Sequence, residues 1–173
     1  MNNKLIILCG IPGTGKTTLM KELIKNRNSV LYQLLNLDPN IKYKTCQAIK
    51  LNKYPKLLTG NIIVHYDIVD RFNNNKFDYL EEYINTYEEI MFVNLIASKD
   101  ELYYRYKSRY IKKYKTNIYR YKELKKLIIS YININNTIRA NEVIYQKWIN
   151  ELSKLNVPNI LILDSTNSEY KVI

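Results

Sequence analysis

A chain of 173 residues is long enough for one domain with a hydrophobic core and too short for two of ordinary size, so we expect a single domain over residues 1–173. Two cysteines and one histidine indicate neither a disulfide framework nor a zinc site, and without an apolar run long enough to span a bilayer we expect a soluble, cytoplasmic protein with no membrane partner. The formal net charge of +11 permits a nucleic-acid partner without establishing one, because A/T-rich codons also produce chains rich in Lys, Asn, Ile and Tyr.

The first predicted elements are a strand, a glycine-rich loop and a helix. Residues 5–9 are an apolar run of strand length, and residues 17–24 have apolar side chains at helical spacing. Between them, residues 10–17 fit the phosphate-binding pattern G-x-x-x-x-G-K-[ST] at every required position. Three of the four glycines of the chain lie here, where a backbone wrapped around a phosphate needs residues without Cβ. The predicted nucleotide-binding residues are Gly10, Ile11, Pro12, Gly13, Thr14, Gly15, Lys16, Thr17 and Thr18.

The loop chemistry predicts ATP and Mg²⁺ as cofactors. Backbone amides at the start of the following helix have no partners within the helix, and with the helix dipole they favour an anion. Lys16 is predicted to reach the β- and γ-phosphates, and the Thr17 hydroxyl to bind the Mg²⁺ between them.

Residues 30–35 are predicted to form the second strand, followed by Asp38 and Pro39. Ligands of α/β sheets lie at the carboxyl ends of the strands, so Asp38 is either a catalytic base for an acceptor hydroxyl or the start of a turn. A short helix is predicted for residues 42–51.

Residues 62–67 are a β-branched run that ends in a carboxylate, as in a buried strand that delivers an acid to the phosphate site. Asp67 is predicted to hold Mg²⁺ directly or through water. Asp164 ends a similar run at residues 160–164, but there an acid commonly caps a turn, and we favour Asp67. His65 lies inside the apolar run and is predicted to be a packed or hydrogen-bonded core histidine.

Residues 77–87 predict a surface helix, and the apolar residues 90–96 predict a strand buried on both faces. Ser98 and Glu101 form a capping box that begins the next helix, which carries Arg105 and Arg109 on one face. The region from about residue 103 to residue 136 is predicted to have one of two functions. It is either a lid whose arginines neutralise charge on a transferred phosphoryl group, or a surface that binds a polynucleotide. A solvated amphipathic face remains an alternative for most of its basic residues and tyrosines.

The end of the chain predicts one more helix and one more strand. Asn135, Asn136 and Thr137 are predicted to cap a final helix that places Trp148 in the core. A last strand follows at residues 160–163, and the polar residues 164–168 are expected near an adenine base.

Three features resemble the P-loop kinases, the small nucleoside, sugar and polynucleotide kinases: the loop 10–17, the strand ending at Asp67, and residues 95–102 followed by two arginines. The resemblance covers essentially the whole chain and implies a three-layer α/β/α sandwich around a five-stranded parallel sheet with a helical lid. That family often places an Asp after the second strand, where only Asp38 matches. The loop is also similar to that of AAA+ ATPases, but no Asp-Glu pair ends the strand at Asp67, and the chain is short for that family.

We therefore expect an ATP-dependent kinase that transfers a phosphoryl group to a small-molecule acceptor. Its catalytic residues would be Lys16, Asp38, Arg105 and Arg109, and its metal would be held by Thr17 and Asp67. The alternatives are a polynucleotide 5′-hydroxyl kinase that uses the basic face of residues 103–126, and a non-enzymatic nucleotide-binding switch or ATPase module.

Overall fold

The computed structural model describes residues 3–46, 60–69, 84–114, 121–155, 157, 159–167 and 170–173. Its centre is a six-stranded sheet with the order β2-β3-β1-β4-β5-β6. The strands are β1 (Lys4–Cys9), β2 (Lys44–Cys46), β3 (Ile62–His65), β4 (Glu89–Ile96), β5 (Ile160–Asp164) and β6 (Lys171–Val172). The first five are parallel, and β6 pairs antiparallel with β5.

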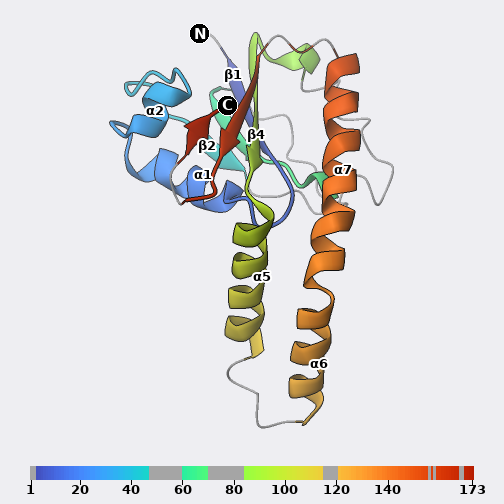
Figure 1. The fold of residues 1–173 in the computed structure, drawn as a ribbon. Helices are drawn as coiled ribbons and strands as arrows, with labels where there is room; N and C mark the ends of the chain where they lie inside the picture. The colour runs from blue at the N-terminus through green and yellow to red at the C-terminus, as the bar shows by residue number, and fades with distance from the viewer. Residues whose placement is uncertain are drawn as a thin grey trace.

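Helices pack against both faces of this sheet, and two of them project beyond it (Figure 1). They are α1 (Lys16–Lys25), α2 (Val30–Leu34), α5 (Lys99–Tyr114), α6 (Tyr121–Ile132) and α7 (Ile134–Lys154). α1 and α2 lie on one side, and the upper part of α7 lies on the other. α5 and α6 run side by side away from the sheet, within the region predicted as a lid.

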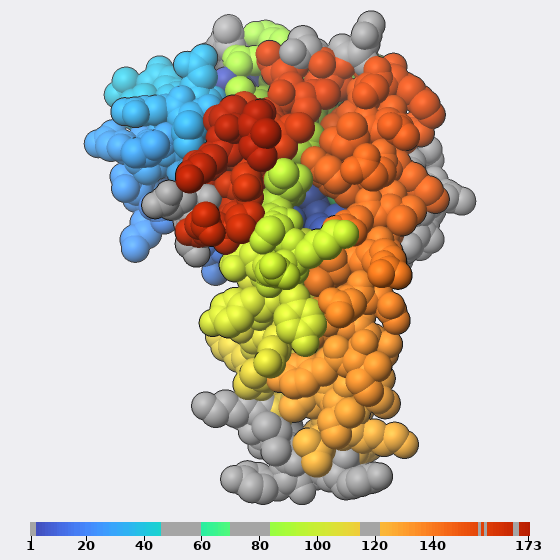
Figure 2. Space-filling view, in the orientation of Figure 1, coloured from blue at the N-terminus to red at the C-terminus, as the bar shows by residue number. Residues whose placement is uncertain are grey.

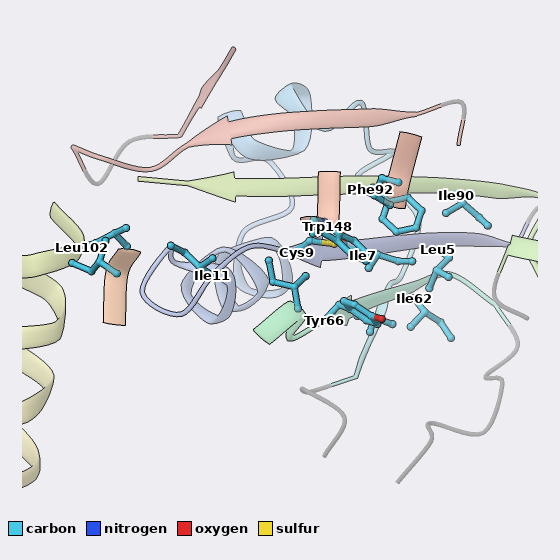
Figure 3. Packing of buried hydrophobic residues seen from close by; sticks show 14 of the residues in the cluster. Leu5, Ile7, Cys9, Ile11, Ile62, Tyr66, Ile90, Phe92, Leu102 and Trp148 are labelled. Carbon is cyan, nitrogen blue, oxygen red and sulfur yellow. The ribbon is translucent and has the colours of Figure 1, made fainter. Parts of the chain in front are cut away.

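Side chains alternate along β1 and divide the hydrophobic core into two clusters, one on each face of the sheet. Leu5, Ile7 and Cys9 contribute to the cluster with Trp148, while Ile6 and Leu8 contribute to the cluster beneath α1 and α2. Because both faces are covered, β1 is a continuous apolar run, as a central parallel strand requires. Figure 3 shows the first cluster.

Trp148 is fully buried, as predicted. Its ring stacks on Tyr66 with the centroids 5.3 Å apart, and its Nε1 donates a hydrogen bond to Asn94 Oδ1 at 2.9 Å. Asn94 is the fully buried polar residue of β4, and the indole N–H satisfies its side-chain oxygen.

The expected second strand is wrong. Residues 30–34 form helix α2, in which Leu31 and Leu35, four residues apart, pack in the cluster beneath α1. A short apolar run fits a strand or a helix turn equally, and here tertiary packing selects the helix. The strand that pairs with β3 on the side away from β1 is β2, which lies inside the predicted helix 42–51 and contradicts it at residues 44–46. Residues 47–51 lie outside the described chain.

The sheet also differs from the expected five parallel strands, because the two residues of β6 add a sixth, antiparallel strand.

The predicted cap at residues 135–137 is wrong too, since α7 begins at Ile134 and contains them. Thr137 fits within the helix because its hydroxyl donates to the carbonyl of Asn133 at 2.9 Å. Strand 90–96 and strand 160–163 are confirmed within β4 and β5, whereas most of the predicted helix 77–87 falls outside the described residues.

No helix in the described part of the chain is long and apolar enough to cross a membrane.

Stability is expected to fall in alkali because tyrosines are buried. Burial raises the pKa values of Tyr43 and Tyr145 to about 12, above the ordinary value near 10. The unfolded chain therefore loses these protons first, so the free energy of unfolding decreases as pH rises from 10 through 12. Urea denaturation at pH 9 and pH 11 should show a smaller pH effect in the double variant Tyr43→Phe/Tyr145→Phe. The control Tyr104→Phe, at a residue 65% exposed, should behave like the parent; equal pH effects in all three proteins would contradict the prediction.

Candidate nucleotide site

The predicted phosphate-binding loop connects the central strand β1 to α1 at the carboxyl edge of the parallel strands. Gly10 and Gly15 have φ angles of 136° and 89°, in the region that favours glycine. A Cβ on Gly10 would lie 2.4 Å from the carbonyl oxygen of Leu95, so the loop approaches β4 more closely than any side chain permits. The predicted strand, loop and helix are therefore confirmed in order and position.

Replacement of Gly10 by alanine is expected to disrupt this loop. Gly60 is the matched control, because it also has a positive φ, of 98°, but a Cβ there would meet no atom within 4 Å. We expect Gly60→Ala to cost about 1 kcal/mol of stability from backbone strain alone, and Gly10→Ala to cost more and to weaken nucleotide binding. Thermal melts and binding titrations on both variants test this; equal losses would mean that the contact with Leu95 has no effect.

Lys16 is buried within the loop. Its Nζ donates hydrogen bonds to the carbonyls of Gly10 at 2.6 Å and Ile11 at 2.9 Å. Burial lowers the pKa of Lys16 to about 8, and the Asp67 carboxylate acts in the opposite direction. The ammonium is therefore desolvated and close to Asp67, which makes it a strong local source of positive potential.

A cavity of about 170 Å³ opens beside Lys16. Asp67 and His65 border it from the end of β3, and Arg109 borders it from α5. The remaining lining residues come from the loop and the start of α1: Pro12, Gly13, Gly15, Lys16, Thr17 and Thr18. The structure thus brings the predicted Lys16, Thr17, Asp67 and Arg109 to one place, although they come from three elements.

Asp164 does not border this cavity. Its Oδ1 accepts hydrogen bonds from the backbone N–H and the hydroxyl of Thr166, so its carboxylate caps the turn after β5. Asp67 accepts a hydrogen bond from the backbone N–H of Val69 at 3.1 Å and lines the cavity. Between the two acids, the geometry favours Asp67.

His65 is not the enclosed core residue that the apolar run predicted. It is half-buried and borders the cavity, and its Nε2 is buried with no hydrogen-bond partner among the described residues. Burial lowers the pKa of His65 to about 4, and the Lys16 charge acts in the same direction. The imidazole is therefore neutral near pH 7.

Arg105 connects three parts of the site. Its Nη1 donates to the carbonyl of Gly13 at 2.9 Å, its Nη2 donates to the carbonyl of Ser165, and its Nε pairs with Glu101 at 2.6 Å. The Ser165 hydroxyl in turn donates to the carbonyl of Thr14 at 2.9 Å. The guanidinium holds the loop against the segment after β5, a structural task that the helical spacing alone did not predict.

Glu101 also departs from the predicted capping box. The Ser98 hydroxyl accepts from the backbone N–H of Glu101 at 3.3 Å, as expected, but the Glu101 carboxylate pairs with Arg105. The backbone N–H of Ser98 donates instead to the hydroxyl of Thr166 at 2.9 Å. α5 therefore begins where predicted, with half of the box in place.

A second cavity, of about 340 Å³, adjoins the first at Arg109 and Thr18. Ser165, within residues 164–168 where an adenine base was expected, borders it together with Tyr170. The other residues around it are Gly13, Gly15, Tyr104, Arg105 and Ser108. The cavity of about 340 Å³ therefore lies next to the smaller cavity that Lys16 borders.

Asp38 lines neither cavity beside the loop, so of its two predicted roles the structure favours the start of a turn over the catalytic base. It follows helix α2 instead of a strand, and it is exposed, with Oδ1 accepting from the backbone N–H of Asn40 at 2.8 Å. Its charge acts on the Tyr43 phenol together with that of Glu89, the first residue of β4. Asp38 therefore lies near the amino ends of the strands, opposite the edge where the loop lies, and it only stabilises a turn.

Tyr106 and Asn141 belong to the site's support, and the sequence pattern did not identify them. The Tyr106 hydroxyl donates to the carbonyl of Pro12 at 2.8 Å, and Asn141 Nδ2 donates to the Tyr106 oxygen at 3.0 Å. Burial raises the pKa of Tyr106, which keeps the donor protonated. The one signal in the sequence was Asn141 among the apolar positions of α7, since a buried amide requires a partner.

Comparison with known proteins agrees with this geometry. A family model described as an AAA domain matches residues 6–127, more than half of the chain. This match supports the predicted P-loop NTPase superfamily. No curated protein matches the chain.

Proposed function

The chain belongs to the AAA domain family, within the P-loop NTPases, and from this premise we propose that it is an ATP·Mg²⁺-dependent kinase. In this proposal it transfers the γ-phosphoryl group to a small acceptor such as a nucleoside, a nucleotide or a sugar. One observation supports it most: Lys16, Thr17, Asp67 and Arg109 border the same small cavity at the carboxyl edge of the sheet. This set supplies cations for phosphates and oxygen ligands for a metal.

The residues around Lys16 fit a magnesium ion. Among the described residues no group of three or more His, Cys, Asp or Glu side chains forms a metal cluster, and magnesium does not need one. Magnesium keeps several waters and takes one or two protein oxygens beside substrate phosphates. Thr17 and Asp67 would provide those oxygens, and the bound metal would neutralise charge on the phosphates.

The two arginines of α5 take different tasks in this proposal. Arg109 is exposed, borders both cavities and would contact the phosphate chain of the nucleotide. The donors of Arg105 are already engaged by Gly13, Ser165 and Glu101, so we assign it to positioning the loop. Charge stabilisation during transfer then rests on Lys16 and Arg109.

The test is a search for phosphoryl transfer with γ-labelled ATP and Mg²⁺. The purified chain is incubated with panels of nucleosides, nucleotides, sugars and oligonucleotides with a 5′-hydroxyl. Labelled product from a small acceptor supports the proposal, and Arg109→Ala should reduce its rate. ATP binding without transfer to any acceptor would contradict the kinase proposal and favour a nucleotide-binding switch or an ATPase module.

A polynucleotide kinase is the second candidate, and the projecting hairpin of α5 and α6 favours it (Figure 1). The described part of this hairpin carries lysines with almost no acidic neighbours beyond the first turn of each helix: Lys107, Lys112, Lys113, Lys122, Lys125 and Lys126. Tyr103 and Tyr104 are exposed on α5, where bases could stack. Oligonucleotide affinity that falls steeply with salt would support this candidate, and no binding at low salt would remove it.

A further inference from the structure

A third cavity, larger than the two at the nucleotide site, is one that Lys16 does not line. Its volume is about 450 Å³, within the range of small-molecule sites. It lies between the end of β4, the first turn of α5 and the middle of α7, and it shares no lining residue with the two cavities of the nucleotide site. Figure 2 shows the hollow between the yellow-green start of α5 and the orange residues of α7, with blue N-terminal residues at its floor.

The walls of this cavity are mostly apolar. Ile11 borders it from the phosphate-binding loop, Leu95 from β4, Leu102 from α5 and Val143 from α7. Val143 is 53% exposed, so an apolar side chain at the mouth of the cavity faces solvent. A ligand with an apolar body would remove this surface from water.

The charges at the rim favour one negative charge on that ligand. Lys99 pairs with Glu142 at 3.3 Å, while Arg139, also at the rim, forms no ion pair with a described residue. Two cations against one carboxylate leave one positive charge, on an exposed guanidinium suited to a carboxylate or sulfonate. Tyr145 and Gln146 add a phenol and an amide to the lining.

We propose that this cavity is a second ligand site, for a small molecule with an apolar body and one acidic group, such as an aromatic carboxylate. The apolar walls would hold the ring system, and Arg139 would hold the acidic group. The site is distinct from the proposed kinase chemistry and does not depend on it. Because Ile11 and Thr14 of the phosphate-binding loop form part of its wall, a ligand here would contact the loop on the side away from Lys16.

Two fluorescent probes test the proposal. 8-Anilinonaphthalene-1-sulfonate has an aromatic body and one sulfonate, and N-phenyl-1-naphthylamine is nearly the same molecule without the charge. We expect the sulfonate probe to bind with a stoichiometry of one and to remain bound when a non-hydrolysable ATP analogue with Mg²⁺ is added. Val143→Trp, which fills the mouth of the cavity, should abolish this binding.

The Arg139→Gln variant tests the contribution of the positive charge to probe binding separately from that of the apolar walls. It should weaken binding of the sulfonate probe roughly tenfold, the typical loss for a hydrogen bond to a charged group, and leave the uncharged probe unchanged. Lys147→Gln, at an exposed residue of α7 that does not line the cavity, is the matched control and should change neither affinity. Circular dichroism and melting temperature confirm that each variant is folded. Sulfonate binding that is unaffected by Val143→Trp, or weakened equally by Arg139→Gln and Lys147→Gln, overturns the proposal.

Discussion

Replacement of Lys16 by methionine is expected to reduce phosphoryl transfer by at least about a hundredfold, the usual loss when one preorganised charged donor is removed. Lys16 is the buried cation of the loop and borders the small cavity with Asp67 and Thr17. Methionine keeps most of the side-chain volume but has no positive charge, so it cannot bind or stabilise the phosphates. Initial rates with γ-labelled ATP measure the loss.

The fold of this variant should persist. Burial lowers the pKa of Lys16 to about 8, so the ammonium still predominates at pH 7 but is less favourable in the folded chain than in the unfolded chain, and an apolar replacement removes that penalty. The variant also loses the hydrogen bonds from Lys16 to the carbonyls of Gly10 and Ile11, which opposes this gain, so we expect a melting temperature close to that of the parent. Lys21→Met is the control, since Lys21 is exposed on the same helix and should lose no activity. A Lys16→Met protein with the parental rate would contradict the proposed role of Lys16.

Replacement of Trp148 by alanine is expected to cost about 3–5 kcal/mol of unfolding free energy, the typical range for a buried large aromatic residue. The Trp148 side chain extends from α7 and is fully buried. Its ring centroid lies 5.3 Å from that of Tyr66 and 6.1 Å from that of Phe92. Its removal also leaves Asn94 Oδ1 without the indole donor. Urea denaturation followed by circular dichroism measures the change, because Trp148 is the only tryptophan and fluorescence is lost with it.

Two further variants separate the causes. Trp148→Phe keeps most of the apolar contact and removes the hydrogen bond, so it should cost about 1–3 kcal/mol. Val143→Ala, on the same helix at a residue 53% exposed, should cost about 0.5 kcal/mol or less. A Trp148→Ala protein as stable as Val143→Ala would mean that α7 does not depend on this contact.

The sequence predicted best where a local pattern corresponds to one structure. The spacing of Gly10, Gly15 and Lys16 specifies a loop between a strand and a helix, and that loop was found. The start of α5 was recognised because Ser98 is followed by Glu101 at the capping-box spacing. Continuous apolar runs also identified β1 and β4, since strands buried on both faces have no polar alternation.

The sequence predicted less well where distant contacts decide the structure. Residues 30–34 became a helix because Leu31 and Leu35 pack beneath α1, a contact that no short window contains. Two of the partners of Arg105, Gly13 and Ser165, are 92 and 60 residues away along the chain. The hydrogen bonds from Asn141 to Tyr106 and from Tyr106 to the loop also join residues that are distant in the sequence. The residues that hold the loop in place could therefore be identified only from the three-dimensional structure.

Equilibrium dialysis of folded protein against labelled ATP tests the central claim most directly, namely that backbone amides between β1 and α1 bind the terminal phosphates of a nucleotide. The account predicts one bound ATP per chain, weaker binding when Mg²⁺ is chelated, and a large loss of affinity in Gly10→Ala. A folded protein that retains neither ATP nor GTP, with or without Mg²⁺, would contradict it.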